Sequence, residues 1–78
     1  MYYTYILRLS SNKYYIGYSS NLKQRLAEHN QGLVLTTKNI PSKKLIYYCA
    51  FITKKKAIDF EKYLKSSSGF AFRNKHLI

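Results

Sequence analysis

Residues 2–18 read YYTYILRLSSNKYYIGY. Residues 2–9 are almost all aromatic, branched or apolar, and the same character resumes at residues 14–18. Between them stands the polar segment Ser10-Ser11-Asn12-Lys13. Two such runs joined by a short polar turn are typical of an antiparallel β-hairpin, and we therefore predict one here.

One face of this hairpin is expected to carry Tyr5, Tyr15 and Gly17. The two tyrosines are an even number of residues apart, so an in-register hairpin with an odd-numbered loop places both rings on the same side. With no side chain, Gly17 would leave a hollow over the sheet in which a phosphate could settle beside the two hydroxyls. A glycine at a bulge or bend, and tyrosines that only fill a core, would give the same pattern.

A helix is predicted for residues 22–30. Asn21 and Gln24 have the spacing of a capping box at its start, and Gly32 suits the position after its end. The next segment, residues 31–44, shows no clear period, contains Pro41 and is long for a connection in a small domain. We therefore expect it to be a functional loop.

The carboxyl half predicts a third strand and two helical segments. Residues 45–52 have strand character, with Cys49 expected as a buried core thiol, and Thr53 is suited to cap a helix that runs to about Lys65. Residues 66–69 are expected to break that helix before a short helical turn at residues 70–75. The 78 residues thus predict a single α+β domain (β-β-α-β-α-α), with a small three-stranded antiparallel sheet flanked by helices.

The positive charge predicts a polyanionic partner. Lys and Arg number 14 against 3 acidic residues, a formal net charge of +11, while the aromatic content of 17% indicates a folded domain rather than a basic tail. Without a long basic amphipathic helix, nucleic acid is favoured over a membrane surface. No membrane-spanning run or signal peptide is visible in the sequence. We therefore expect a cytoplasmic protein, monomeric or weakly dimeric, with no small-molecule cofactor.

Carboxylates are the usual protein ligands of a hard cation, and the chain offers only Glu28, Asp59 and Glu61. At about 100° per residue, Glu61 lies at the edge of the apolar arc of the second helix, whereas Asp59 points to the opposite side. A carboxylate that leans toward the core needs compensation by a cation or by hydrogen bonds. A salt bridge to Arg25 and a metal site meet this requirement equally well.

The first helix also turns two polar side chains inward. Leu22 and Leu26 define its buried side, and Arg25 and His29 lie in the same arc, one turn apart. A lone histidine there is more often a satisfied core residue than a catalyst. Together with an arginine and a carboxylate facing them from another helix, however, it supplies the elements of phosphoryl transfer: charge stabilisation, a proton carrier and a cation.

These residues resemble the motifs of the GIY-YIG nucleases over essentially the whole chain. Tyr3-Thr4-Tyr5 followed by Tyr15-Ile16-Gly17 is similar to the paired tripeptides of that family, although Tyr3 and Thr4 replace its glycine and isoleucine. Tyr18 stands where some relatives carry a lysine. The remaining motif positions correspond to Arg25, His29, Glu61 and Asn74.

The resemblance implies an endonuclease that hydrolyses DNA phosphodiester bonds in repair or recombination. Tyr5 and Tyr15 would contact or activate the attacking water, and Arg25 would bind the scissile phosphate. His29 would assist proton transfer, Glu61 would hold one Mg²⁺ or Mn²⁺ ion, and Asn74 would support the phosphate or neighbouring polar groups. No element is shaped for the major groove, so we expect structure-selective or weakly sequence-specific cleavage.

Contacts to DNA are expected from residues around this site. The lysines at positions 54–56 occupy the first turn of the second helix, where positive charge opposes the helix dipole, and a phosphate contact would offset that cost. A solvated surface run is the alternative. The predicted contact residues are Gly17, Tyr18, Lys38, Lys54, Lys55, Lys56 and Arg73, with a basic footprint that extends to Lys43, Lys44, Lys75 and His76.

Two other functions remain open from the sequence. The first is a non-catalytic DNA- or RNA-binding module on the same fold. The second is a ribosome- or protein-associated basic domain, which predicts that Tyr15, Arg25 and Glu61 lie far apart.

Overall fold

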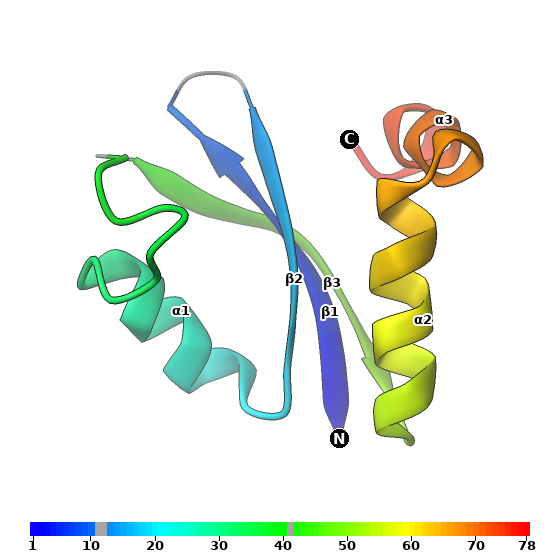
Figure 1. Cartoon of the computed structure of the whole chain (residues 1–78), viewed down its shortest axis with the longest axis horizontal. Coiled ribbons are helices and arrows are strands. Elements are labelled where there is room, and N and C mark those ends of the chain that lie inside the picture. The colour runs from blue at the N-terminus through cyan, green and yellow to red at the C-terminus, as the bar shows by residue number, and fades with distance from the viewer. Residues whose placement is uncertain (11–12, 41) are drawn as a thin grey trace.

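The computed structural model describes residues 1–10, 13–40 and 42–78. Ser11 and Asn12 of the predicted hairpin turn, and Pro41 of the predicted loop, lie outside the described residues. Helix α1 and the loop after it cover one face of an antiparallel sheet, and α2 and α3 cover the other (Figure 1). The order confirms the predicted α+β class, with β1 (Tyr2–Leu9), β2 (Tyr14–Ser19), α1 (Leu22–Asn30), β3 (Lys43–Phe51), α2 (Lys54–Lys65) and α3 (Ser67–His76).

The strand order is β2-β1-β3, so β2 and β3 are the two edges of the sheet. Strand β1 pairs antiparallel with both neighbours. On the β2 side, Tyr5 lies opposite Gly17 and Leu7 lies opposite Tyr15. Because side chains alternate along a strand, Tyr5, Tyr15 and Gly17 share one face, as the sequence predicted.

The central strand is buried on both faces, which gives the molecule two thin cores. Tyr5, Leu7 and Leu9 form the first, against which α1 packs through Leu22 and Leu26. Ile6 and Ile16 form the second with Leu64 of α2. Thr4 faces the same helix, and its Oγ1 donates a hydrogen bond of 2.6 Å to the carbonyl of Ala57. This bond fixes α2 on the sheet at a fully buried position.

The predicted caps of α1 and α2 are confirmed. The Asn21 Oδ1 accepts from the backbone N–H of Gln24 at 3.1 Å, and the Thr53 Oγ1 accepts from that of Lys56 at 3.2 Å. The second hydrogen bond of the expected capping box, from the Asn21 backbone N–H to the Gln24 side chain, is replaced by other contacts. The Gln24 side chain meets the Asn21 side chain, while the Asn21 backbone N–H donates to the hydroxyl of Ser19.

The predicted break between the last two helices was wrong in extent. Helix α3 already begins at Ser67, because Ser66 alone ends α2 and caps α3 by accepting from the Gly69 N–H at 3.2 Å. A Cβ at Gly69 would overlap the carbonyl oxygen of Tyr63. The serine-rich segment is therefore a tight helix-to-helix corner that depends on this glycine, and a full helix follows it.

Two smaller expectations also need correction. Strand β3 begins at Lys43, two residues before the predicted start, because its pairing with β1 extends to Leu9. Cys49 is half-buried rather than buried, since β3 is an edge strand. Across the described ranges, none of the helices combines the length and apolar character needed to cross a bilayer.

Candidate active site

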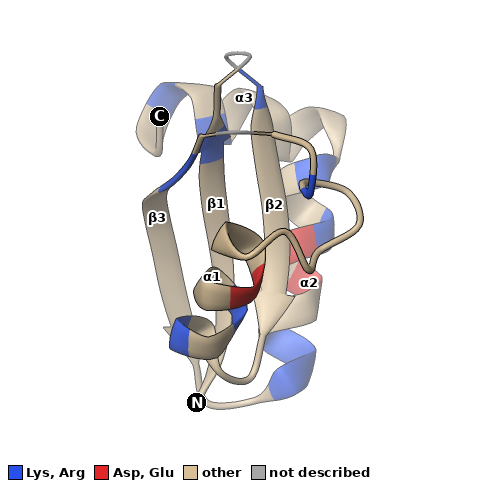
Figure 2. Cartoon of the chain, turned by 90° about the vertical axis from the view of Figure 1, so that its left-hand side faces the viewer, with Lys and Arg blue, Asp and Glu red and all other residues tan. Residues whose placement is uncertain are grey.

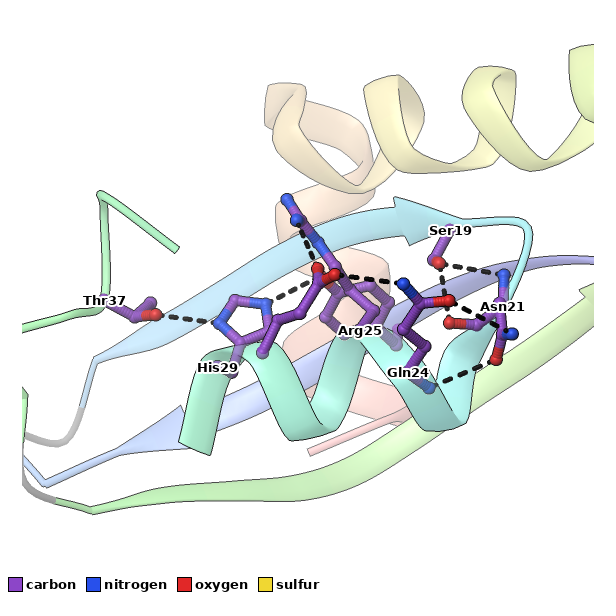
Figure 3. A network of polar contacts seen from close by, with 8 residues as sticks. Ser19, Asn21, Gln24, Arg25, His29 and Thr37 are labelled. Carbon is purple, nitrogen blue, oxygen red and sulfur yellow. Dashed lines mark hydrogen bonds and ion pairs between the residues drawn. The ribbon is translucent and has the colours of Figure 1, made fainter. Parts of the chain in front are cut away.

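A chain of buried polar side chains links β1, α1 and the loop after α1. The Tyr5 hydroxyl lies 2.8 Å from the His29 Nε2, and the His29 Nδ1 lies 2.8 Å from the Thr37 Oγ1 (Figure 3). All three side chains are almost completely excluded from solvent. The Tyr15 ring packs edge-on against His29, with 5.0 Å between ring centroids. Loop residue Thr37 thus fixes the orientation of the histidine.

Burial and nearby charge set the protonation of this chain. Burial raises the pKa of Tyr5 to about 12, although the adjacent Arg25 guanidinium acts in the opposite direction. Burial lowers the pKa of His29, and the positive charges of Arg25 and Lys43 lower it further. At neutral pH Tyr5 is therefore a phenol and His29 a neutral imidazole, which donates a hydrogen bond from one ring nitrogen and accepts one at the other.

Arg25 links this buried chain to solvent. Its side chain is 36% exposed, and its Nη1 donates to the Glu28 Oε1 at 3.1 Å. The Gln24 side-chain amide donates to the other Glu28 oxygen at 3.3 Å (Figure 3). The Glu28 carboxylate is thus bound by both Gln24 and Arg25, which fixes its position beside the guanidinium. These side chains border a depression of about 300 Å³, the arginine pocket, lined by Tyr18, Ser19, Ser20, Asn21, Gln24, Arg25 and Glu28.

Glu61 lies on the other side of the sheet from Arg25. It lies on α2, whereas Arg25 lies on α1, and the two helices cover opposite faces (Figure 1). Of the two alternatives that the sequence left open for Glu61, the salt bridge to Arg25 was wrong, because each side chain pairs within its own helix. The Glu61 carboxylate, 21% exposed, accepts from the Lys65 Nζ at 2.8 Å.

The two faces meet around the open edge of β2. A second depression of about 480 Å³, the edge pocket, is lined by Tyr14, Tyr15, Ile16, Thr36, Leu64, Lys65, Phe70 and Arg73. It therefore joins the loop on the α1 side, strand β2 itself, and helices α2 and α3. Seen from the α1 side, α1 lies in front of the sheet and α2 lies behind it, packed against β2 (Figure 2). The partner of Glu61 thus lines the same pocket as Tyr15.

The space expected over Gly17 is not a hollow. A Cβ built on Gly17 would lie 2.5 Å from the Tyr5 hydroxyl oxygen and 2.9 Å from a ring carbon of Tyr15. The Tyr5 ring fills the space that was predicted for a phosphate. Because Tyr5 is also fully buried, only Tyr15 of the two tyrosines lines a solvent-facing pocket.

Asn74 is separate from the buried chain. It is exposed on α3, and its Oδ1 accepts from the Arg73 Nε and Nη2 at 3.3 and 3.2 Å. It borders a further depression of about 470 Å³ with Lys13, Tyr14, Phe70 and Arg73. The structure thus brings together Tyr5, Tyr15, Arg25 and His29. Glu61 and Asn74 are not in contact with these four residues, but each binds a residue that lines the edge pocket, Lys65 and Arg73 respectively.

The predicted DNA-contact residues have different environments. Lys38 and the lysines at positions 54–56 are exposed, and Lys55 pairs with Asp59 at 2.7 Å. Tyr18 is half-buried, stacks on Tyr2 and lines the arginine pocket. Arg73 is not the free surface cation we expected. It is 8% exposed, and its guanidinium lies 4.4 Å from the Phe70 ring and 5.2 Å from that of Tyr14.

Three site residues were missed in the sequence. Glu28 and Lys65 stand three or four residues from Arg25 and Glu61 on the same helices, and this spacing predicts the pairs that the structure shows. Thr37 carries no such signal. Its role depends on where the loop folds back over α1.

Glu61 is a single candidate carboxylate ligand for a hard cation. No group of three or more His, Cys, Asp or Glu side chains gathers anywhere in residues 1–10, 13–40 and 42–78. Mg²⁺ commonly uses one or two carboxylates and fills its other positions with water and phosphate oxygens. Glu61 fits this role if the surface ion pair to Lys65, whose side chain is 54% exposed, opens.

Comparisons with known proteins agree over most of the chain. A sequence model described as the GIY-YIG catalytic domain matches residues 1–75. A UPF0213 protein of Streptococcus pneumoniae is 40% identical over 65 residues, which are 81% of this chain and 65% of that protein. This chain therefore spans less than two thirds of that relative's length. A UPF0213 protein of Pediococcus acidilactici is 34% identical over 70 residues, 86% of this chain and 71% of the relative.

A solved structure shows the same fold. The solution NMR structure of a UPF0213 protein from Bacillus halodurans is similar with a TM-score of 0.60 and 25% sequence identity. The match covers 96% of this chain and 84% of that chain.

Proposed function

Because this chain belongs to the GIY-YIG catalytic domain family, we propose that it is a metal-dependent endonuclease that hydrolyses DNA phosphodiester bonds at the outer edge of β2. The membership confirms the resemblance seen in the sequence, and it implies a nuclease family that acts on DNA. The observation that carries the proposal is the convergence at this edge of Tyr15, the exposed end of Arg25 and the buried pair of Tyr5 and His29. Glu61 of α2 pairs with Lys65, which lines the edge pocket.

Arg25 has the properties of a phosphate-binding group. Its guanidinium is partly exposed and carries a permanent charge, and the contacts to Glu28 and Tyr5 raise its pKa further. In the proposed reaction it binds the non-bridging oxygens of the scissile phosphate and stabilises the charge that grows there. Glu28 holds the guanidinium in place while the Arg25 side chain stays 36% exposed.

The proton of the attacking water is proposed to leave through Tyr15, Tyr5 and His29. Tyr15 reaches the edge pocket, whereas Tyr5 is fully buried and hydrogen-bonded to His29. With a pKa of about 12, Tyr5 does not act as a base near pH 7, but a phenol passes a proton on by accepting one and donating its own. Neutral His29 is the acceptor at the buried end, and Thr37 holds its other ring nitrogen.

Glu61 is proposed to hold the metal ion, Mg²⁺ or Mn²⁺. Once bound, such an ion stabilises charge on the phosphate oxygens and lowers the pKa of coordinated water. Since the protein offers one carboxylate there, we expect weak metal binding without DNA and tighter binding when a phosphate supplies further oxygens. A role in DNA repair or recombination, with a choice of substrate by structure rather than sequence, completes the proposal.

Nicking of a supercoiled plasmid tests the proposed function. In Mg²⁺ or Mn²⁺ we expect the wild-type protein to nick, and Arg25→Ala and Glu61→Ala to lose about a hundredfold or more in rate. The first matched control is Lys23→Ala, at an exposed position of α1. The second is Asp59→Ala, which removes the ion pair between Asp59 and Lys55 on α2. Both controls should nick at wild-type rates. A wild-type protein that binds DNA without nicking it in either metal would leave only a binding module.

A further inference from the structure

The edge pocket carries features that hydrolysis of a phosphodiester bond does not need. Two aromatic residues, Tyr14 and Phe70, line it beside the catalytic candidate Tyr15. Phe70 is 53% exposed although it is large and apolar. Neither aromatic residue has a role in the proposed chemistry.

Arg73 holds these two rings in place. Its guanidinium lies between them, 4.4 Å from the centroid of Phe70 and 5.2 Å from that of Tyr14, and it is almost fully buried. Asn74 accepts two of its N–H groups, which fixes the plane of the guanidinium. Cation–π contacts of this kind order both rings, so Phe70 presents a rigid apolar surface to the pocket.

The charge of the pocket favours an anionic occupant. Among the residues that line it, Lys65 and Arg73 are cationic, and none is acidic. The Lys65 side chain is 54% exposed, and its ammonium group, which pairs with the Glu61 carboxylate at 2.8 Å, becomes available to a phosphate when that surface ion pair opens. An exposed aromatic surface next to a cation is the combination that binds a nucleobase together with its phosphate.

The occupant must also be able to expose a ring. A base inside a duplex is stacked on both sides and has no free face for Phe70, whereas an unpaired base does. The volume of about 480 Å³ lies within the range of about 300–1,000 Å³ that small ligands occupy in proteins. Because Tyr15 lines the same pocket, a base bound there would be a close neighbour of the scissile phosphate.

We propose that the edge pocket binds an unpaired nucleobase of single-stranded DNA, stacked on Phe70 with its phosphate at Lys65, next to the bond that is cut. This inference rests on the proposed function for its substrate, and it deepens that function by naming the substrate class. DNA with a single-stranded segment at a junction, such as an overhang or a flap, would be preferred over a continuous duplex.

Equilibrium binding separates this inference from catalysis. Fluorescence anisotropy in EDTA, which prevents cleavage, compares a blunt duplex with the same duplex bearing a single-stranded overhang. We expect the wild-type protein to bind the overhang DNA more tightly. Phe70→Leu keeps apolar bulk but removes the ring, and should weaken overhang binding by about tenfold, with blunt-duplex binding unchanged. Phe70→Tyr should retain the preference.

The matched control is Tyr48→Leu, which removes another exposed aromatic ring, on β3. It should change neither affinity. The ratio of the two affinities on one protein sample does not depend on the fraction that is folded. Equal weakening of both DNAs by Phe70→Leu, or no weakening of either, would overturn the proposal.

A change in the DNA tests the same point without any variant. An overhang of abasic nucleotides keeps the phosphates and removes the rings, so wild-type protein should bind it about tenfold more weakly than the normal overhang. Equal affinity for the two would show that phosphates alone are recognised, and the stacking site would be rejected. If plasmid nicking is absent but this preference is present, only the proposed hydrolysis fails. If nicking is present without the preference, only the pocket assignment fails.

Discussion

Replacement of Gly17 by alanine is expected to destabilise the protein, against the usual preference of strands. Alanine inside a strand is normally about 0.5–1 kcal/mol more favourable than glycine. Here the added Cβ would lie 2.5 Å from the Tyr5 hydroxyl oxygen, where ordinary contact begins at 3.4 Å, so the ring must withdraw by about 0.9 Å. Tyr5 is fully buried and hydrogen-bonded to His29, so that space is not available without repacking.

Overpacking of this kind costs about 1–3 kcal/mol, which exceeds the backbone gain. We therefore expect Gly17→Ala to lose about 1–2 kcal/mol of unfolding free energy, a fall in Tm of about 5–15 °C for a domain of this size. Urea and thermal unfolding followed by circular dichroism measure both quantities. The double variant Tyr5→Leu/Gly17→Ala should be more stable than the sum of its single changes predicts, because leucine lacks the colliding atoms. An unchanged or higher Tm for Gly17→Ala would refute the packing of Tyr5 over Gly17.

Three further predictions concern the scaffold of the site. Gly69→Ala should lower the free energy of unfolding by about 3 kcal/mol, because its Cβ would overlap a backbone atom of α2. The control Ser68→Ala, at an exposed position, should change it very little. Equal urea midpoints for the two variants would contradict the tight corner between α2 and α3. Thr4→Val should lower the free energy of unfolding by about 1 kcal/mol, because it removes the hydrogen bond to α2, whereas Thr4→Ser should retain that bond. Equal losses of unfolding free energy in the two variants would show that the hydrogen bond contributes nothing beyond packing. Since the folded pKa of His29 is lowered, its contribution to stability is present in full above the unfolded value of about 6.5 and is lost as the pH falls through the folded pKa. Urea unfolding at pH 7.5 and 5 should show this decline in the wild-type protein, and an equal decline in His29→Gln would assign it elsewhere.

The sequence predicted the elements of the fold well because its signals were local. The alternating apolar runs around Ser10-Ser11-Asn12-Lys13 predicted the hairpin, and Asn21 and Thr53 marked the starts of two helices. The error at α3 arose because three serines and a glycine are typical of a loop. Their role as a tight corner depends on how closely α3 approaches the carbonyl of Tyr63, which local sequence does not encode.

The partial burial of two candidate site residues was predictable from the sequence, but their arrangement in space was not. Periodicity placed Glu61 and Arg25 on the inner sides of their helices, and both are partly buried. It could not reveal that these helices cover opposite faces of the sheet, so an ion pair between them stayed open as an alternative until the structure excluded it. The burial of Tyr5 over Gly17 was likewise inaccessible, because an open hollow and a filled one have the same strand pattern.

The central claim is that Arg25 from α1 and Glu61 from α2 act on one phosphodiester around the edge of β2. Single-turnover nicking rates of the wild-type protein, Arg25→Ala, Glu61→Gln and the double variant test it directly. If Arg25 and Glu61 stabilise the transition state as one unit, removing either side chain removes the effect of both. The double variant should then be about as slow as the slower single variant. Losses that multiply in the double variant, or a wild-type rate in either single variant, would contradict a shared site.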